Sequence, residues 1–168
     1  MQRFTTKTLT LMALLIALEI VLSRFLSVSA WNTKIGFSFV PQVLAALLLG
    51  PLYAGIVGAL ADLLGAVLFP VGPYFPGFTL TAFLAGVLYG LLLFRQTGFP
   101  RILAAAGLRQ FLLSLLLNTF WISVLYDSPF RPLLLTRLPQ CALLFAVELA
   151  VIPLLVKLAP RLKGAGNG

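Results

Sequence analysis

The sequence predicts an all-α integral membrane protein, a bundle of six transmembrane helices. Hydrophobic residues make up 61% of the 168 residues and charged residues only 10%, whereas soluble domains carry about 25% charged residues. The apolar residues also fall in long stretches, most of them near the roughly 20 residues with which a helix crosses a bilayer core. Lipid, rather than water, is therefore the expected solvent of most side chains.

Each apolar stretch, or part of one, is expected to form one helix. The stretch 37–69 is too long for a single helix, because at about 1.5 Å per residue it would overshoot the bilayer core. Gly50-Pro51 is a turn signal inside this stretch, so we divide it there. The predicted helices are 8–28, 39–49, 52–69, 77–94, 102–125 and 133–158. They form one domain, 1–160, and a short basic and glycine-containing tail, 161–168, is expected to be disordered.

The distribution of basic side chains predicts the orientation. Six helices place both termini on one side of the membrane, and Lys and Arg concentrate in cytoplasmic segments. Eight of the twelve basic residues lie on the side of the termini and four toward the other side, which predicts cytoplasmic termini. Five helices, without the Gly50-Pro51 break, would put the basic clusters on opposite sides. The eight are Arg3, Lys7, Arg95, Arg101, Arg109, Lys157, Arg161 and Lys163; the four are Arg24, Lys34, Arg131 and Arg137.

The residue types that are missing exclude several functions. Histidine, the commonest metal ligand and general base, is absent. The single cysteine, Cys141, cannot form an intrachain disulfide. No phosphate-binding loop, nucleophile elbow or cysteine–histidine cluster occurs. We therefore expect no enzyme, no metal and no cofactor. The net charge of +8 would suggest nucleic acid in a soluble domain, but here the basic residues lie near helix ends, so no nucleic-acid partner is expected.

Three acidic residues lie within the apolar stretches. An ionisable group at the centre of a membrane helix costs roughly 2.5–3.5 kcal/mol on insertion scales, so each needs a reason to be there. Asp62 lies near the middle of its helix, where a helix-packing hydrogen bond is slightly favoured over a role with a ligand or ion. For Glu19 and Glu148, a structural partner and a functional role are equally supported.

Two polar helix faces and a cluster of aromatic residues indicate a binding cavity near the outer surface. Arg137 and Gln140 are three residues apart, as are Asn118 and Trp121, so each pair shares one face; interhelical hydrogen bonding is the alternative. The proline-rich connection 69–77 is expected to be a rigid cavity wall. Aromatic residues are denser near the outer connections than near the inner ones, whereas an aromatic belt occupies both interfaces. This excess favours a flat ligand that stacks on aromatic rings, whose anionic end could meet Arg24, Lys34, Arg131 or Arg137.

Small residues recur at four-residue spacing, which lets helices approach closely in lipid. Examples are Ala13 with Ala17 and Gly86 with Gly90, and Ala54, Gly58 and Asp62 form a third stripe. Packing within the bundle is the preferred interpretation of each motif. For Ala13 and Ala17, docking against a different subunit is the alternative.

Several segments together resemble the folate-specific substrate-binding subunits (S components) of energy-coupling factor (ECF) transporters. The resemblance covers most of the chain and is least distinctive across 95–117. The segments are Arg24-Phe25; Lys34-Ile35-Gly36-Phe37 followed by Pro41; Gly50-Pro51; Gly58 with Asp62; Arg137-Leu138-Pro139-Gln140; and, most specific, FPVGPYFPGFTLTA at 69–82.

The resemblance implies a six-helix bundle of the S-component type that captures folate with high affinity from the extracellular side of the bacterial plasma membrane. It implies delivery with a transmembrane coupling subunit, which Ala13 and Ala17 would contact, and with two ABC ATPases that hydrolyse ATP. A pterin ring suits aromatic residues with Asn118 or Gln140, and the glutamate carboxylates suit Arg or Lys; which residue meets which end stays open. The resemblance places at or near the ligand Arg24, Trp31, Lys34, Phe37, Phe75, Phe78, Thr79, Asn118, Trp121, Arg137 and Gln140.

Three alternatives remain at this point. Another flat vitamin or pterin-like compound would keep the fold and change the ligand. A stand-alone small secondary transporter, coupled to protons through Asp62 or Glu148, is less supported because the chain shows no inverted repeat. A membrane-embedded enzyme is least supported, because histidine and a carboxylate cluster are missing.

Overall fold

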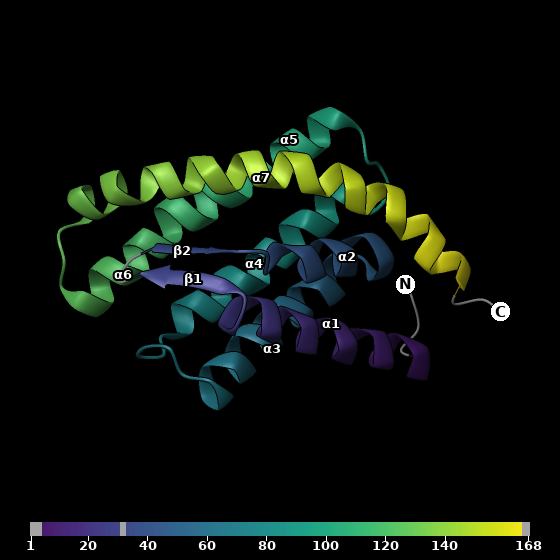
Figure 1. Cartoon of the computed structure of the whole chain (residues 1–168), viewed down its shortest axis with the longest axis horizontal. Coiled ribbons are helices and arrows are strands. Elements are labelled where there is room, and N and C mark those ends of the chain that lie inside the picture. Colours follow the sequence, from purple (N-terminus) through teal and green to yellow (C-terminus); the bar gives the residue numbers. More distant parts are fainter. Residues whose placement is uncertain (1–4, 31–32, 166–168) are drawn as a thin grey trace.

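The computed structural model describes residues 5–30 and 33–165, with side chains for 5–27 and 35–160. This part of the chain is a bundle of helices with one two-stranded hairpin (Figure 1). The elements in chain order are α1 (Thr6–Arg24), β1 (Ser27–Ala30), β2 (Thr33–Gly36), α2 (Phe39–Leu49), α3 (Pro51–Leu68), α4 (Pro76–Leu93), α5 (Phe99–Gly107), the π-helix η1 (Leu108–Leu117), α6 (Asn118–Tyr126) and α7 (Phe130–Ala165).

Five of the described helical segments are long and apolar enough to cross a membrane, as expected for a multi-pass membrane protein. They are α1, α3, α4, the continuous run Phe99–Tyr126 formed by α5, η1 and α6, and the part Phe130–Pro160 of α7. The sixth apolar helix, α2, has 11 residues. At about 1.5 Å per residue it spans only about half of a bilayer core.

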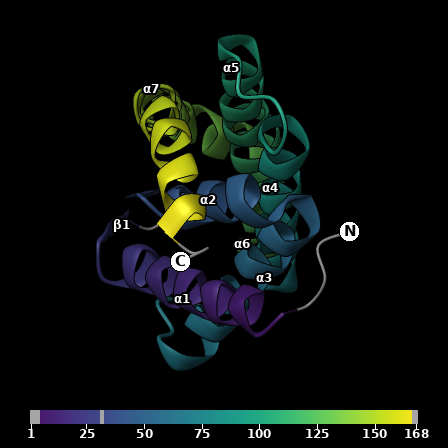
Figure 2. The same cartoon turned by 90° about the vertical axis from the view of Figure 1, so that its right-hand side faces the viewer.

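The short helix α2 lies in the middle of the bundle, with α1, α3, α4 and α7 packed around it (Figure 2). Its side chains Val43, Ala45 and Ala46 have no exposed surface. Neighbouring helices therefore cover α2, so its length does not have to match the thickness of the lipid. The predicted helix 39–49 is confirmed, and so is the break after it. Gly50 adopts a φ of 98°, a conformation that favours glycine, and Pro51 begins α3.

The hairpin is a small addition to an otherwise all-helical fold, and it corrects the end of the predicted first helix, 8–28. Helix α1 ends at Arg24, and β1 pairs antiparallel with β2 from Ser27 opposite Gly36 to Ala30 opposite Thr33. The β-branched residues Val28, Thr33 and Ile35 favour extended backbone. Two strands separated by two residues are typical of a hairpin. At the other end of the chain, α7 continues to Ala165, past residue 160, where the predicted bundle ends.

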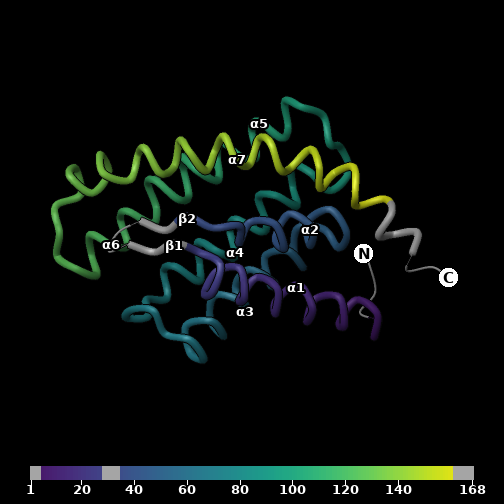
Figure 3. The backbone as a smooth tube through the Cα atoms, in the orientation of Figure 1, coloured from purple at the N-terminus to yellow at the C-terminus, as the bar shows by residue number. Residues whose placement is uncertain are grey.

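The connections gather at the two ends of the bundle (Figures 1 and 3). The hairpin, the connection 69–75 and the connection from α6 to α7 lie at one end. The Gly50 turn and the connection 94–98 lie at the other end, together with the beginning of α1 and the end of α7. The described chain therefore begins and finishes at the same end of the bundle.

The small-residue motifs of α3 and α4 pack against each other. A Cβ added to Gly86 would lie 2.2 Å from the Ala54 carbonyl oxygen, and one added to Gly58 would lie 2.6 Å from the Ala82 carbonyl oxygen. Only glycine allows such close backbones, so internal packing is confirmed for these motifs. Ala13 and Ala17 differ, since both lie on the exposed face of α1.

Candidate ligand-binding site

A cavity of about 290 Å³ lies inside the bundle, and a smaller one of about 110 Å³ lies beside it. The larger chamber is lined by residues of α1, α2 with the preceding Ser38, α3, the connection 69–75, α4, η1 and α6. The smaller chamber extends toward α7, and the two share Ser38, Arg109, Ser114 and Asn118. The larger is lined by Glu19, Ser23, Arg24, Ser38, Gln42, Asp62, Ala66, Gly72, Pro73, Tyr74, Phe75, Phe78, Thr81, Ala82, Ala85, Arg109, Leu113, Ser114 and Asn118.

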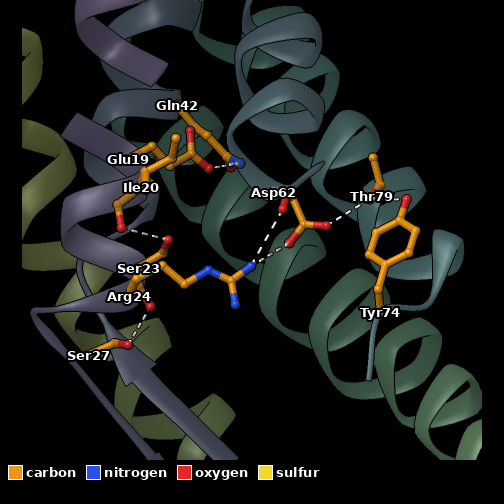
Figure 4. Close-up of polar contacts among 9 residues, drawn as sticks. All are labelled: Glu19, Ile20, Ser23, Arg24, Ser27, Gln42, Asp62, Tyr74 and Thr79. Atoms are coloured by element: carbon orange, nitrogen blue, oxygen red, sulfur yellow. Dashed lines mark hydrogen bonds and ion pairs between the residues drawn. The ribbon is translucent and has the colours of Figure 1, made fainter. Parts of the chain in front are cut away.

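One wall of the larger chamber is held by a chain of polar contacts around Asp62 (Figure 4). The Thr79 hydroxyl donates to Asp62 Oδ2 at 2.8 Å and lies 3.1 Å from the Tyr74 hydroxyl. The Arg24 Nη2 atom lies 4.0 Å from Asp62 Oδ1 and donates to the Asp62 carbonyl oxygen at 3.5 Å. These contacts tie α1, α3, α4 and the connection 69–75 together and hold a guanidinium at the chamber.

A second polar contact crosses from α1 to α2. The Gln42 Nε2 atom donates to Glu19 Oε1 at 2.7 Å, and both side chains are buried (Figure 4). The Gln42 Oε1 and Asn118 Oδ1 atoms are buried and accept no hydrogen bond from the described residues. A buried acceptor without a partner costs about 1–3 kcal/mol. Two amide oxygens beside the chamber therefore have capacity to accept from a ligand.

The boundary of the two chambers carries a largely buried ion pair. The Arg109 Nε atom lies 3.7 Å from Glu148 Oε1, and the Glu148 side chain has no exposed surface. Gln110 Nε2 also donates to Glu148 Oε1, at 2.5 Å. On α7, Arg137 Nη2 donates to the Ser114 carbonyl oxygen at 3.3 Å. The smaller chamber therefore has charged side chains on two helices: Arg109 on η1, and Arg137 and Glu148 on α7.

The π-helical segment η1 places several of these groups. A π-helix bonds each residue to the one five positions along, and here Arg109, Ser114 and Asn118, at spacings of five and four, all line both chambers. The charge count groups Arg109 with the basic residues on the side of the termini, although Arg109 falls inside the predicted helix 102–125. In the structure Arg109 lies ten residues into the span Phe99–Tyr126 and lines both chambers, so it does not belong with the connection that precedes this span.

Aromatic side chains line the larger chamber beside the connection 69–75. Tyr74, Phe75 and Phe78 line it. Behind them, the Trp121 ring lies 5.6 Å from the Phe75 ring, and Trp121 Nε1 donates to the Thr81 hydroxyl at 3.1 Å. The connection 69–75 thus contributes to the wall, as predicted.

The predicted ligand residues fall into three groups: those that line a chamber, those that line neither chamber, and those outside the described residues. Arg24, Phe75, Phe78 and Asn118 line the larger chamber, and Asn118, Arg137 and Gln140 line the smaller. Thr79 and Trp121 line neither chamber but bond to residues that do. Phe37 is half exposed, contacts Phe39 and lines neither chamber. Trp31 and the Lys34 side chain lie outside the described residues. The ligand contacts of all eleven stay predictions.

Several lining residues were not predicted as ligand contacts. Seven of them are polar residues within or next to an apolar span: Glu19, Ser38, Gln42, Thr81, Arg109, Ser114 and Glu148. An isolated polar side chain in such a span is the signal that could have found them, because lipid exposure would be costly. Asp62, weighed as a packing residue, also lines the larger chamber and accepts from Thr79.

Comparison with known proteins identifies close relatives. The family model of the substrate-specific component of ECF transporters matches residues 7–156. The folate transporter FolT of Clostridium novyi (strain NT) is 42% identical over 90% of this chain and 89% of its own length. The FolT of Leuconostoc mesenteroides subsp. mesenteroides is 34% identical over 75% of this chain and 69% of its own length. A crystal structure of FolT bound with folic acid matches with a TM-score of 0.87 and 35% identity, covering 91% of this chain and 94% of that one.

Proposed function

This chain belongs to the family of substrate-specific components of ECF transporters, and on that premise we propose that it binds folate in the two chambers and delivers it for import. The observation that carries the proposal is the likeness to FolT bound with folic acid, which extends over nearly the whole of both chains. The family is one of transporter subunits rather than enzymes.

The chemistry of the chambers suits the parts of folate. The flat pterin can stack on Phe75 or Phe78, and its N–H groups can donate to the Asn118 or Gln42 amide oxygen. The glutamate carboxylates can pair with the Arg24, Arg109 or Arg137 guanidinium, and such charge-assisted bonds are about twice as strong as neutral ones. The arginines come from three different spans, so an elongated anionic ligand would bridge the bundle.

Membership of the family supports the rest of the assembly. In this proposal the chain crosses the bacterial plasma membrane six times, with α2 as the buried sixth crossing and both termini cytoplasmic. Without Arg109, seven basic residues remain on the side of the termini against four on the other, so the charge asymmetry persists. The chain works with a transmembrane coupling subunit and two ABC ATPases. The exposed pair Ala13 and Ala17 is the proposed contact with the coupling subunit.

The test is folate binding to the purified chain in detergent, without any ATPase, followed by calorimetry and tryptophan fluorescence. We expect tight binding with one folate per chain. Arg24→Gln should weaken it about 10-fold or more, since a hydrogen bond to a charged group is worth about 1.5–3 kcal/mol. Arg131→Gln, at an exposed position of α7 away from both chambers, is the matched control. Binding of another flat vitamin in place of folate would change the substrate, and binding of no vitamin would overturn the capture function.

A further inference from the structure

A third cavity, of about 270 Å³, lies at the opposite end of the bundle from the hairpin. It lies where α3 begins, α4 ends and α5 begins. Arg95, Gln96 and Arg101 form its polar side, and Pro51, Leu91 and Phe94 form its apolar side. It shares no residue with the two chambers described above.

The described residues offer no counter-charge to the two arginines of this cavity. No ion pair or side-chain hydrogen bond joins Arg95 or Arg101 to another described residue. The sequence holds four acidic residues in all. Glu19, Asp62 and Glu148 line the two chambers, and Asp127 follows α6 at the hairpin end. No acidic side chain of the described residues therefore balances the positive charge of the third cavity.

The cavity is built at the level where the chain leaves the membrane. Arg95 and Gln96 lie in the connection between the spans Pro76–Leu93 and Phe99–Tyr126, and Arg101 lies in the first turn of the second. Leu91, one turn inside the first span, has 67% of its surface exposed. A Cβ added to Gly90 would lie 2.1 Å from Pro51 Cα, so closely packed backbone forms the adjacent floor. An apolar surface thus continues from the arginines toward the bilayer core.

We propose that this cavity binds the headgroup phosphate of an anionic glycerophospholipid, with Arg95 and Arg101 on the phosphate and an acyl chain along Leu91. Basic pockets between membrane helices at the cytoplasmic surface recognise such headgroups. Two cationic side chains next to an exposed leucine suit an anion that carries an apolar chain better than they suit a small soluble anion. Gln96 adds a donor for the headgroup glycerol. The site is separate from the folate chambers and does not depend on the proposed substrate.

The experiment measures lipid retention by the whole purified chain. The wild type is titrated in detergent with phosphatidylglycerol, phosphatidylcholine or inorganic phosphate, and bound lipid and the unfolding temperature are recorded. The test variant is Arg95→Gln/Arg101→Gln. The matched control, Lys7→Gln/Lys157→Gln, removes two exposed charges at the same end of the bundle but outside the cavity. Folate binding by the same preparations reports on folding.

Phosphatidylglycerol should bind and raise the unfolding temperature of the wild type, whereas phosphatidylcholine and inorganic phosphate should not. The arginine variant should bind phosphatidylglycerol about 25-fold more weakly, because each arginine near the surface contributes about fivefold. The lysine variant should bind as the wild type does. Gln96→Glu places a carboxylate at an exposed position of the cavity and should weaken lipid binding even if the arginine variant fails to fold.

Three results would overturn the proposal. Equal losses in the arginine and lysine variants would indicate diffuse surface charge. Equal protection by inorganic phosphate would indicate a soluble-anion site. Normal lipid retention by the arginine variant, with lost co-purification of a coupling subunit, would indicate a protein-docking site.

Discussion

Removing one member of the Arg109–Glu148 pair should destabilise the protein far more than removing both. Glu148 has no exposed surface, and Arg109 Nε lies 3.7 Å from its carboxylate. Breaking a buried pair from one side leaves an uncompensated charge and costs about 3–5 kcal/mol. Arg109→Gln should therefore lower the unfolding temperature by about 6–20 °C, at about 2–4 °C per kcal/mol for a chain of this size. Glu148→Gln should cost less, because Arg109 also reaches the cavity.

The stability of the double variant Arg109→Gln/Glu148→Gln is the decisive measurement. This variant removes both charges, and the new amide at position 148 can still accept from Gln110, which donates to Glu148 in the native chain. Its stability should return to within about 1 kcal/mol of the wild type, since replacing a whole buried pair is often neutral. Thermal unfolding of the wild type, the two single variants and the double variant in one detergent completes a double-mutant cycle.

Folate binding by the same four proteins separates structure from recognition. If Arg109 meets a substrate carboxylate, the stable double variant should bind folate about 10- to 150-fold more weakly, since a hydrogen bond to a charged group is worth about 1.5–3 kcal/mol. Additive stability losses would refute the pairing itself. A stable double variant with wild-type folate affinity would instead remove Arg109 from the ligand contacts.

Three further predictions concern other parts of the molecule. Arg137→Ala should weaken folate binding more than it lowers the unfolding temperature, because Arg137 lines the smaller chamber, whereas Arg131→Ala, on the exposed side of α7, should change neither. Ala13→Trp or Ala17→Trp should leave folate binding intact and block co-purification with the coupling subunit, whereas Val67→Trp, at an exposed position of α3, should not; unchanged assembly would argue against the docking role. Gly86→Ala should cost about 1–3 kcal/mol, because its Cβ would lie 2.2 Å from the Ala54 carbonyl oxygen. Gly107→Ala, whose Cβ would meet only the Phe145 ring at 3.8 Å, should stabilise the helix by about 0.4–1 kcal/mol; equal effects in thermal unfolding would refute the close approach.

Features set by local chemistry could be predicted from the sequence. The helix 39–49 and the break at Gly50-Pro51 depend on a glycine φ of 98° and a proline at the first helical position, which any reading of that dipeptide suggests. The chamber wall formed by 69–75 could be predicted in the same way, from three prolines in and beside it. The motif formed by Ala13 and Ala17 could be found in the sequence. Only the packing of α1 shows that both residues lie on its exposed face.

Features set by long-range packing could not be predicted. Ser27–Ala30 forms a strand that pairs with Thr33–Gly36, whereas the apolar pattern alone extends the first helix to residue 28. Arg109 was assigned to the side of the termini because it is near Arg95 and Arg101 in the sequence. Its position beside the chambers depends on the ion pair with Glu148, 39 residues later, and on the π-helical backbone of η1, which no local sequence pattern predicts.

The structural and functional interpretations of the acidic residues in the chambers, Glu19, Asp62 and Glu148, need not exclude each other. Each of the three lines a chamber and accepts a hydrogen bond from a different helix: Glu19 from Gln42 of α2, Asp62 from Thr79 of α4, and Glu148 from Gln110 of η1. The same carboxylates thus join the helices that line the chambers and set the polarity of the chamber walls. Substituting one of them should therefore change stability and binding together. Only a paired change that keeps the interhelical bond, such as the double variant at Arg109 and Glu148, can separate the two effects.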